Sequence, residues 1–135
     1  VYKADDPKLI EELKNNNNGG VNYSFECVGS EKAMELAYKI LKRGGTVVSS
    51  GLSHPDKNFS IQHVDLVASE KVIKGSFLGS CVPARDIPAY IELYKSGRLE
   101  VDRLMSDHIS LDQINEGFDK LSEGSTVRQV IMFND

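Results

Sequence analysis

The stretch GVNYSFECVGSEKAMELAYKILKRGGTVVSSGL, residues 20–52, decides the fold. Its first part, residues 21–28, alternates apolar and more polar side chains as a β-strand does, until Gly29 breaks the pattern. Ser30 is then a suitable helix N-cap, and Glu31 places negative charge in the first turn, where the helix dipole favours it. The sequence therefore predicts a strand, a tight turn and a helix.

The rest of this stretch completes a strand–helix–strand unit. The buried face of the predicted helix is formed by Ala33, Ala37, Ile40 and Leu41. The helix is predicted to end at residues 42–45, because basic residues followed by glycine are typical of helix C-termini. Residues 46–50 are small and β-branched, which is typical of a strand covered on both faces, and Gly51 ends them.

The flanking sequence adds a helix before this unit and a strand after it. Residues 5–14 are predicted to form a helix, which the Asn- and Gly-rich residues 15–20 end. After a loop and a short helical stretch at residues 61–69, residues 72–78 are predicted to form a third strand, which Gly79 ends.

Past this strand the pattern is mainly helical. One predicted helix has an apolar face at i, i+3, i+4 and i+7 spacing, which we expect in the core: Ile87, Tyr90, Ile91 and Tyr94. Ser110 and Gln113 form a capping box for another helix, and residues 127–133 form a final strand. This order of elements predicts an α/β fold with a parallel sheet and right-handed crossovers.

Composition excludes several function classes. The 135 residues are 40% hydrophobic and 27% charged with a formal net charge of −4, so a nucleic-acid partner is not expected. The sequence has no apolar run long enough for a membrane span and no secretory leader. Two cysteines are too few for a disulfide framework. We expect a reduced, cytoplasmic setting without membrane association.

Three predicted strands end in segments that point to a ligand site. Parallel sheets bind nucleotides at the carboxyl ends of their strands, where glycine lets the backbone approach a ring or ribose closely. The segments at these ends are residues 27–29, 50–52 and 76–79. Each glycine alone is explained by a turn, but three at equivalent strand ends favour a bound ligand.

Three stretches, in order along the chain, resemble the medium-chain, zinc-type alcohol dehydrogenases. Residues 20–52 are similar to the second half of that family's cofactor domain, and KVIKGSFLGS, residues 71–80, to its last cofactor-domain strand. HISLDQINEGFDKLSEGSTVRQVIMF, residues 108–133, resembles the family's C-terminal signature. The resemblance implies half of a Rossmann-type parallel sheet at residues 1–79 and the C-terminal segment of the catalytic domain at residues 80–135.

The resemblance also implies a role for each segment in binding NAD or NADP. Positions that match the family's cofactor contacts are Cys27, Val28, Gly29, Ser50, Gly51, Leu52, Ser76, Phe77, Leu78 and Arg128. The first segment would lie beside the adenosine side, and the second would approach the nicotinamide ribose and ring. Backbone groups of Ser76 and Leu78 would bond to the nicotinamide carboxamide. Arg128 would reach the pyrophosphate, because a guanidinium can clasp two phosphate oxygens; apart from the resemblance, a surface salt bridge is the simpler interpretation.

Parts that the reaction needs are not found in this sequence. None of the eleven glycines forms the G-x-G-x-x-G phosphate loop, and no Cys-rich set of structural zinc ligands occurs. The resemblance implies that the ligands of the catalytic zinc lie in an N-terminal half of the intact enzyme, with roughly 200 further residues upstream. We expect this chain alone to be inactive and to bind the cofactor weakly or not at all, while the intact enzyme moves hydride between an alcohol or aldehyde and NAD(P).

Two alternatives stay open. A zinc-free quinone or enoyl reductase of the same superfamily would share these stretches, although INEGFDKL, residues 114–121, and GSFLGS, residues 75–80, favour the zinc branch. A non-catalytic dimerising or nucleotide-binding domain is the alternative from another class. The family resemblance further implies a homodimer that pairs through residues 72–78, and an unpaired edge at residues 21–28 would also invite pairing.

The remaining chemically active side chains have simpler interpretations. His54, His63 and His108 are dispersed and show no metal-ligand spacing. Cys27 is expected to be a small buried hydrophobe, and Cys81 a loop thiol without an activating neighbour. We therefore predict neither catalytic nor metal-binding residues in this chain.

Overall fold

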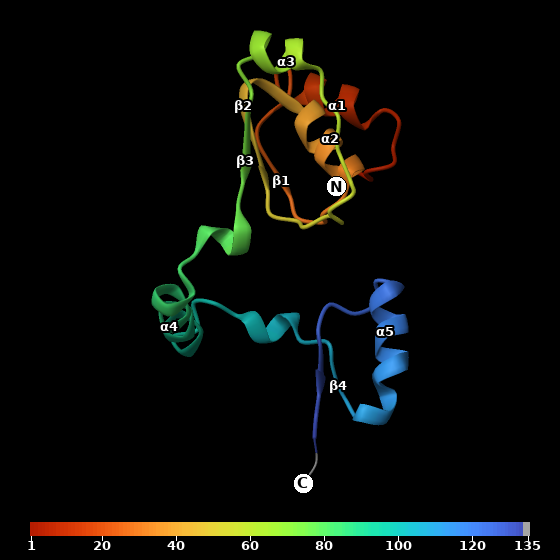
Figure 1. Cartoon of the computed structure of the whole chain (residues 1–135), viewed down its shortest axis with the longest axis vertical. Coiled ribbons are helices and arrows are strands. Elements are labelled where there is room, and N and C mark those ends of the chain that lie inside the picture. The colour runs from red at the N-terminus through yellow and green to blue at the C-terminus, as the bar shows by residue number, and fades with distance from the viewer. Residues whose placement is uncertain (134–135) are drawn as a thin grey trace. The chain divides into compact units, whose positions relative to one another are not determined.

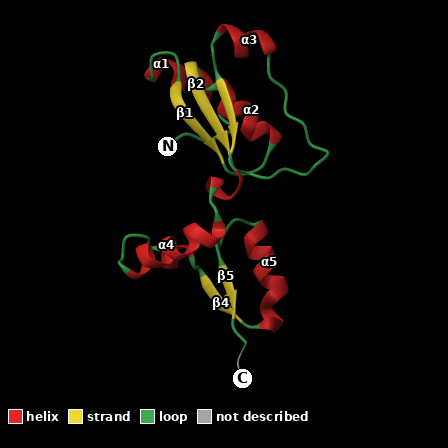
Figure 2. Cartoon of the chain, turned by 60° about the vertical axis from the view of Figure 1, so that its left-hand side comes forward, coloured by secondary structure: helices red, strands yellow, loops and turns green. Residues whose placement is uncertain are grey.

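The computed structural model describes residues 1–133, which fall into two compact units. The first unit is Val1–Cys81 and the second is Val82–Asp135. Each unit is an α/β arrangement with its own parallel strands (Figures 1 and 2). The predicted α/β class is confirmed.

A three-stranded parallel sheet forms the centre of the first unit. Its strands β1 (Val21–Glu26), β2 (Leu41–Ser49) and β3 (Val72–Gly75) lie side by side in chain order. Glu26 pairs with Ser49, and Ser49 pairs with Gly75. This register brings the carboxyl ends of all three strands to the same edge of the sheet.

Three helices surround this sheet: α1 (Leu9–Asn16), α2 (Glu31–Lys39) and α3 (His63–Ala68). Helix α2 carries the main contact with the sheet, and its apolar face packs on β2 (Figure 1). The buried cluster comprises Met34, Ala37, Tyr38, Leu41 and Val47. Burial of these side chains holds β1, α2 and β2 together as one strand–helix–strand unit.

The inward-facing side chains of β1 are polar ones. Tyr23 and Phe25 are 67% and 70% exposed, whereas Ser24 and Glu26 are buried. The polar side chains can face inward because each has a partner there: the Ser24 hydroxyl donates to the Ala37 carbonyl oxygen at 2.7 Å, and Glu26 accepts bonds from the following turn. The expectation that Cys27 is buried was wrong, because its side chain is exposed.

Several element boundaries differ from the prediction, including those of the final strand, predicted at residues 127–133 and found at Gln129–Ile131. Helix α2 ends at Lys39, and β2 already begins at Leu41, which pairs with Val21 across an irregularity in the register. The basic and glycine residues 42–45 therefore lie within β2. Strand β3 ends at Gly75, and Phe77–Ser80 form a 3-10 turn (η1) in which Leu78 has φ +49°, an uncommon left-handed conformation for leucine.

The second unit contains a smaller parallel pair. Helix α4 (Pro83–Lys95) and a 3-10 turn, η2 (Val101–Leu104), precede strand β4 (Asp107–Ile109). Strand β5 (Gln129–Ile131) pairs with β4 after a second 3-10 turn, η3 (Leu111–Gln113), and helix α5 (Ile114–Ser122).

Two predictions for this unit have different outcomes. The capping box of Ser110 and Gln113 is present, at the start of η3 just before α5. The apolar face of α4, however, is not in a core: Ile87, Tyr90 and Tyr94 are 50%, 46% and 46% exposed. No helix among residues 1–133 is both long enough and apolar enough to cross a membrane.

Candidate functional site

The turns that follow the three strands of the first unit meet at one edge of the sheet. The backbone N–H groups of Ser50 and Gly51 donate to the carbonyl oxygen of Glu26 at 2.8 and 3.2 Å. The N–H of Ser76 donates to the carbonyl oxygen of Ser49 at 2.9 Å. We call residues 27–29, 50–52 and 76–78 the turn edge.

Two glycines of the turn edge are required by close backbone contact. A Cβ atom on Gly29, which has φ +78°, would lie 2.4 Å from the Leu52 carbonyl oxygen. A Cβ on Gly51 would lie 2.1 Å from the Gly29 nitrogen. Any side chain at either position would clash with the backbone of the other turn. The first two turns can therefore be in direct backbone contact only because both residues are glycine.

The side chain of Glu26 holds the first turn and links it to the end of β2. Its Oε1 accepts hydrogen bonds from the backbone N–H groups of Val28 and Gly29 at 2.8 and 2.6 Å. Its Oε2 accepts a bond from the Ser49 hydroxyl at 2.8 Å. Glu26 is only 4% exposed, so these hydrogen bonds replace the bonds to water that its carboxylate loses on burial.

Two opposing effects set the pKa of Glu26. Burial disfavours the charged form and raises the pKa, but the bonds from Ser49, Gly29 and Val28 favour it and together outweigh burial. The net pKa is lowered, so the side chain is a carboxylate at neutral pH. Sequence reasoning missed this residue, although an acidic side chain at the last position of a strand, three residues before a glycine, was a usable signal.

The outer surface of the turn edge is open and partly apolar. An open hollow of about 440 Å³ is lined by Ser49, Ser50, Gly51, Leu52, Gly75, Ser76 and Phe77. The side chains of Val28, Leu52 and Phe77 are 79%, 78% and 67% exposed. Apolar side chains beside exposed backbone can contact the flat face of a ring, while nearby N–H and C=O groups orient its polar substituents.

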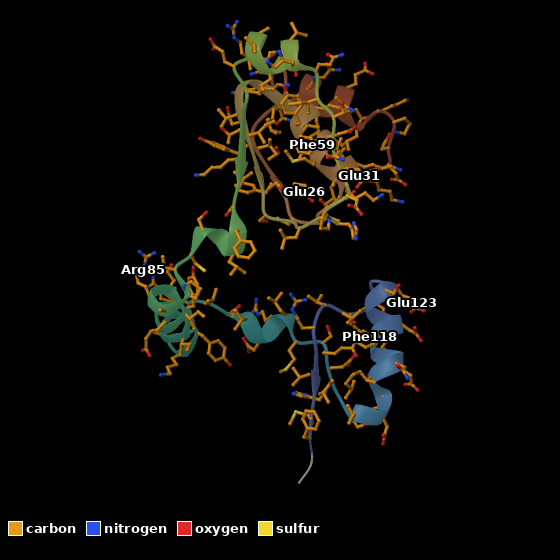
Figure 3. All side chains as sticks on the ribbon, viewed as in Figure 1. Glu26, Glu31, Phe59, Arg85, Phe118 and Glu123 are labelled. Carbon is orange, nitrogen blue, oxygen red and sulfur yellow. The ribbon has the colours of Figure 1, made fainter. Side chains whose placement is uncertain are left out.

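A second hollow, of about 230 Å³, lies deeper against α2. Its charged lining comes from Glu26 at the end of β1, Glu31 on α2, Lys57 in the following loop and Lys74 on β3. Figure 3 labels Glu26, Glu31 and Phe59, which all line this hollow. Lys57 Nζ lies 3.6 Å from Glu31 Oε1, so part of this charge is already paired.

The predicted cofactor residues are divided between the units. Cys27, Val28, Gly29, Ser50, Gly51, Leu52, Ser76, Phe77 and Leu78 all belong to the turn edge. The Ser50 hydroxyl lies 3.3 Å from Cys27 Sγ, which links the first two segments once more. Arg128 belongs to the second unit, where its side chain is exposed and donates to the Val127 carbonyl oxygen at 3.1 Å.

A part-buried ion pair beside Tyr38 of α2 has a structural role. Lys71 Nζ lies 3.0 Å from Asp65 Oδ2 and 4.5 Å from the centre of the Tyr38 ring. Burial, with a further contribution from Asp65, raises the pKa of Tyr38 to about 12. A phenol with so high a pKa is a poor general base at neutral pH.

The described residues do not fit a zinc site. Over residues 1–133, no group of three or more His, Cys, Asp and Glu side chains is placed to hold a metal ion. His54 pairs with Asp56 at 3.5 Å, and both side chains are exposed. No step of the chemistry is therefore assigned here to a metal held by this chain.

Comparison with known proteins gives consistent matches. The sequence model of the family described as zinc-binding dehydrogenase matches residues 1–96. Alcohol dehydrogenase 1 of Cenchrus americanus is 33% identical over 133 residues, covering 97% of this chain and 35% of that protein. The S-(hydroxymethyl)glutathione dehydrogenase of Paracoccus denitrificans is 33% identical over 116 residues, covering 85% of this chain and 31% of that protein.

Solved structures give the same result. Benzyl alcohol dehydrogenase from Acinetobacter calcoaceticus superposes with a TM-score of 0.83 at 25% identity, over 96% of this chain and 35% of that one. The chain thus spans about a third of the length of the relatives it matches; for alcohol dehydrogenase 1 of Cenchrus americanus the share is 35%.

Proposed function

Since the chain belongs to the zinc-binding dehydrogenase family, we propose that its turn edge forms the nicotinamide-side floor of the dinucleotide site in an alcohol dehydrogenase. The observation that carries this proposal is that three strand-end turns meet at one edge of the sheet, beside an open hollow that the second and third of them line. Ligands of parallel α/β sheets bind at this end of the strands.

Each segment of the turn edge is assigned a part of NAD or NADP. Residues 27–29 lie beside the adenosine side, and residues 50–52 approach the nicotinamide ribose and ring. Backbone groups of Ser76 and Leu78 bond to the carboxamide, with Phe77 between them. Arg128 binds the pyrophosphate, for which its exposed guanidinium is suited.

The proposal divides the chain into two functional parts. Residues 1–79 form the second half of the cofactor domain, and residues 80–135 form the C-terminal segment of the catalytic domain. The division into compact units after Cys81 supports a boundary in this region. Strand β3 lies at an edge of the sheet, which supports pairing of two copies through residues 72–78.

In the intact enzyme, hydride passes between the alcohol carbon and the nicotinamide ring. Zinc, which other parts of the protein would bind, supplies Lewis-acid stabilisation of the alcohol oxygen. Residues of this chain fix the ring and its carboxamide so that one ring face meets the substrate. We place the enzyme in the cytoplasm, with a small alcohol or aldehyde as its substrate.

The exposed thiol of Cys27 provides a direct test. Cys27 belongs to the turn edge, whereas Cys81 follows η1 and serves as an internal control. Alkylation of both thiols by iodoacetamide would be followed by mass spectrometry in the intact enzyme, which includes the upstream residues, with and without millimolar NAD⁺. We expect NAD⁺ to slow alkylation of Cys27 and to leave that of Cys81 unchanged. Equal rates at Cys27 with and without NAD⁺ and NADP⁺ would contradict the proposal and favour a non-catalytic dimerising domain.

A further inference from the structure

One residue, Glu26, connects the first two turns of the turn edge. Its backbone carbonyl oxygen accepts bonds from Ser50 and Gly51 of the second turn. Its side-chain carboxylate accepts bonds from Val28 and Gly29 of the first turn. The first turn is therefore bonded to the side chain of Glu26, and the second turn to its backbone.

The Glu26 side chain is tightly packed between the two turns. A Cβ on Gly51 would lie 2.9 Å from Glu26 Oε2, and one on Gly29 would contact the Leu52 backbone. The two turns thus contact each other and also contact the carboxylate between them. A shift of the carboxylate would have to move the backbone of at least one turn.

The hydrogen bonds of Glu26 indicate which side chains could replace it and keep the turn in place. Both turn amides bind the same oxygen, Oε1, while Ser49 binds Oε2. A glutamine can keep one oxygen toward the amides and present its NH₂ group to Ser49, whose hydroxyl can rotate to accept. An alanine would leave two amide groups without their acceptor in a part-buried site.

We propose that Glu26 is a positioning residue that sets the spacing of residues 27–29 and 50–52, and through it the fit of the turn edge to a dinucleotide. This inference rests on the proposed function for its ligand. Glu26 acts through the two turns and does not contact the cofactor itself. Its contribution lies in preorganisation, because turns already in place lose less conformational entropy when a ligand binds.

A matched control lies two residues earlier on the same strand. Ser24 is buried on the same face of β1 and donates a side-chain hydrogen bond to the Ala37 carbonyl oxygen, away from both turns. Ser24→Ala removes one buried side-chain hydrogen bond without touching the turn edge. It therefore reports the general cost of disturbing β1.

The test compares backbone amide hydrogen exchange in the whole chain and in three variants by NMR: Glu26→Gln, Glu26→Ala and Ser24→Ala. In Glu26→Ala we expect the Val28 and Gly29 amides to exchange about tenfold faster or more, relative to amides of the β1–β2 ladder. Glu26→Gln should restore most of this protection, and Ser24→Ala should leave the relative exchange of the turns unchanged. Unchanged exchange at Val28 and Gly29 in Glu26→Ala, or an equal effect of Ser24→Ala, would overturn the proposal.

A pH titration of the unsubstituted chain avoids any variant that fails to fold. The Val28 and Gly29 amide protons should shift together as Glu26 protonates, at a pH below the ordinary pKa of a glutamate side chain, because the bonds from Ser49, Gly29 and Val28 lower the pKa of Glu26. Glu31, Lys57 and Lys74 line the same hollow, so Glu31→Gln serves to separate the titration of Glu31 from that of Glu26. The assignment of Glu26 as the acceptor would be contradicted if the amide chemical shifts did not change with pH below the ordinary pKa of glutamate, or if that change disappeared in Glu31→Gln.

Cofactor binding separates failure of this inference from failure of the proposed function. If NAD⁺ shifts the turn-edge amides of the unsubstituted chain, Glu26→Ala should weaken that binding more than Ser24→Ala does, and equal weakening would overturn the inference. If saturating NAD⁺ shifts no turn-edge amide in the intact enzyme, the dinucleotide assignment fails, and with it the ligand part of the inference. The exchange and pH measurements then still decide whether Glu26 holds the turns.

Discussion

The two units of this chain differ in how much of their apolar surface they bury. The fully buried apolar side chains of the described residues all lie in the first unit: Leu9, Met34, Ala37, Tyr38, Leu41 and Val47. In the second unit only Gly117 is buried among the described residues, and the apolar faces of α4 and α5 are largely exposed.

This difference teaches what an apolar stripe can and cannot specify. The spacing of Ile87, Tyr90, Ile91 and Tyr94 correctly indicates a helix with one apolar face. It does not say which segment covers that face, and within residues 1–133 these side chains remain about half exposed. The first unit owes its stability to its own core, and the second has little core of its own.

The largest expected effect compares one leucine from each unit. Leu41 is 1% exposed and Leu121 is 42% exposed. Leu41→Ala should lower the free energy of unfolding by about 3–5 kcal/mol, because it leaves a cavity in the core of the first unit, whereas Leu121→Ala should cost about 1 kcal/mol. Urea unfolding followed at NMR signals of each unit measures both. Equal losses would refute the contrast between the units.

A glycine from each unit sharpens the comparison at the backbone. Gly29 and Gly97 have similar positive φ angles of +78° and +71°, but only Gly29 has backbone within reach of an added Cβ. Gly97→Ala should cost about 1 kcal/mol from strain alone. Gly29→Ala should cost about 3 kcal/mol, since backbone must also move. Thermal and urea denaturation of the two variants would show whether the turn contact is as tight as described.

An ion pair from each unit should give a smaller difference. Lys71 is 5% exposed in its pair with Asp65, whereas Arg103 is 76% exposed in its pair with Glu100. Lys71→Met should cost about 2 kcal/mol, because Asp65 loses its partner in a part-buried site. Arg103→Met should cost less than about 0.5 kcal/mol. Comparable losses in the unfolding free energy would mean that burial does not distinguish these pairs.

The smallest expected effect is the response of the first unit to acid. Bonds from Lys71 and Ser69 lower the pKa of Asp65, and the pKa of Glu26 is also lowered. A lowered folded-state pKa contributes stability that is fully present above the unfolded-state pKa and is lost as the pH falls through the folded-state value. Stability of the first unit should thus be level above about pH 5 and decline below it. Glu26→Gln should reduce this slope, while Ser24→Ala should preserve it.

The sequence predicted the framework of the first unit well, for physical reasons. Strand, helix and turn signals in residues 20–52 agree with one another, so the order of these elements along the chain and the turns after the first two strands could be predicted. The start of β2 could not, because Ile40 and Leu41 continue the apolar pattern of the helix and equally suit a buried strand start.

The missed part of the site has a different cause. Alternation along β1 defines two faces, one with Tyr23 and Phe25 and one with Ser24 and Glu26, but it does not specify which face is buried. The structure turns Ser24 and Glu26 inward, since the Ala37 carbonyl and the turn amides satisfy them there. These partners lie elsewhere in the sequence or in a turn, so pattern alone does not reveal them.

The central claim, that three strand-end turns form one side of a dinucleotide site, is tested most directly by an NMR titration of this chain with millimolar NAD⁺ and NADP⁺. We predict weak binding with amide shift changes concentrated at residues 27–29, 50–52 and 76–78. Changes spread evenly over both units, or none at these residues while other segments respond, would contradict the account.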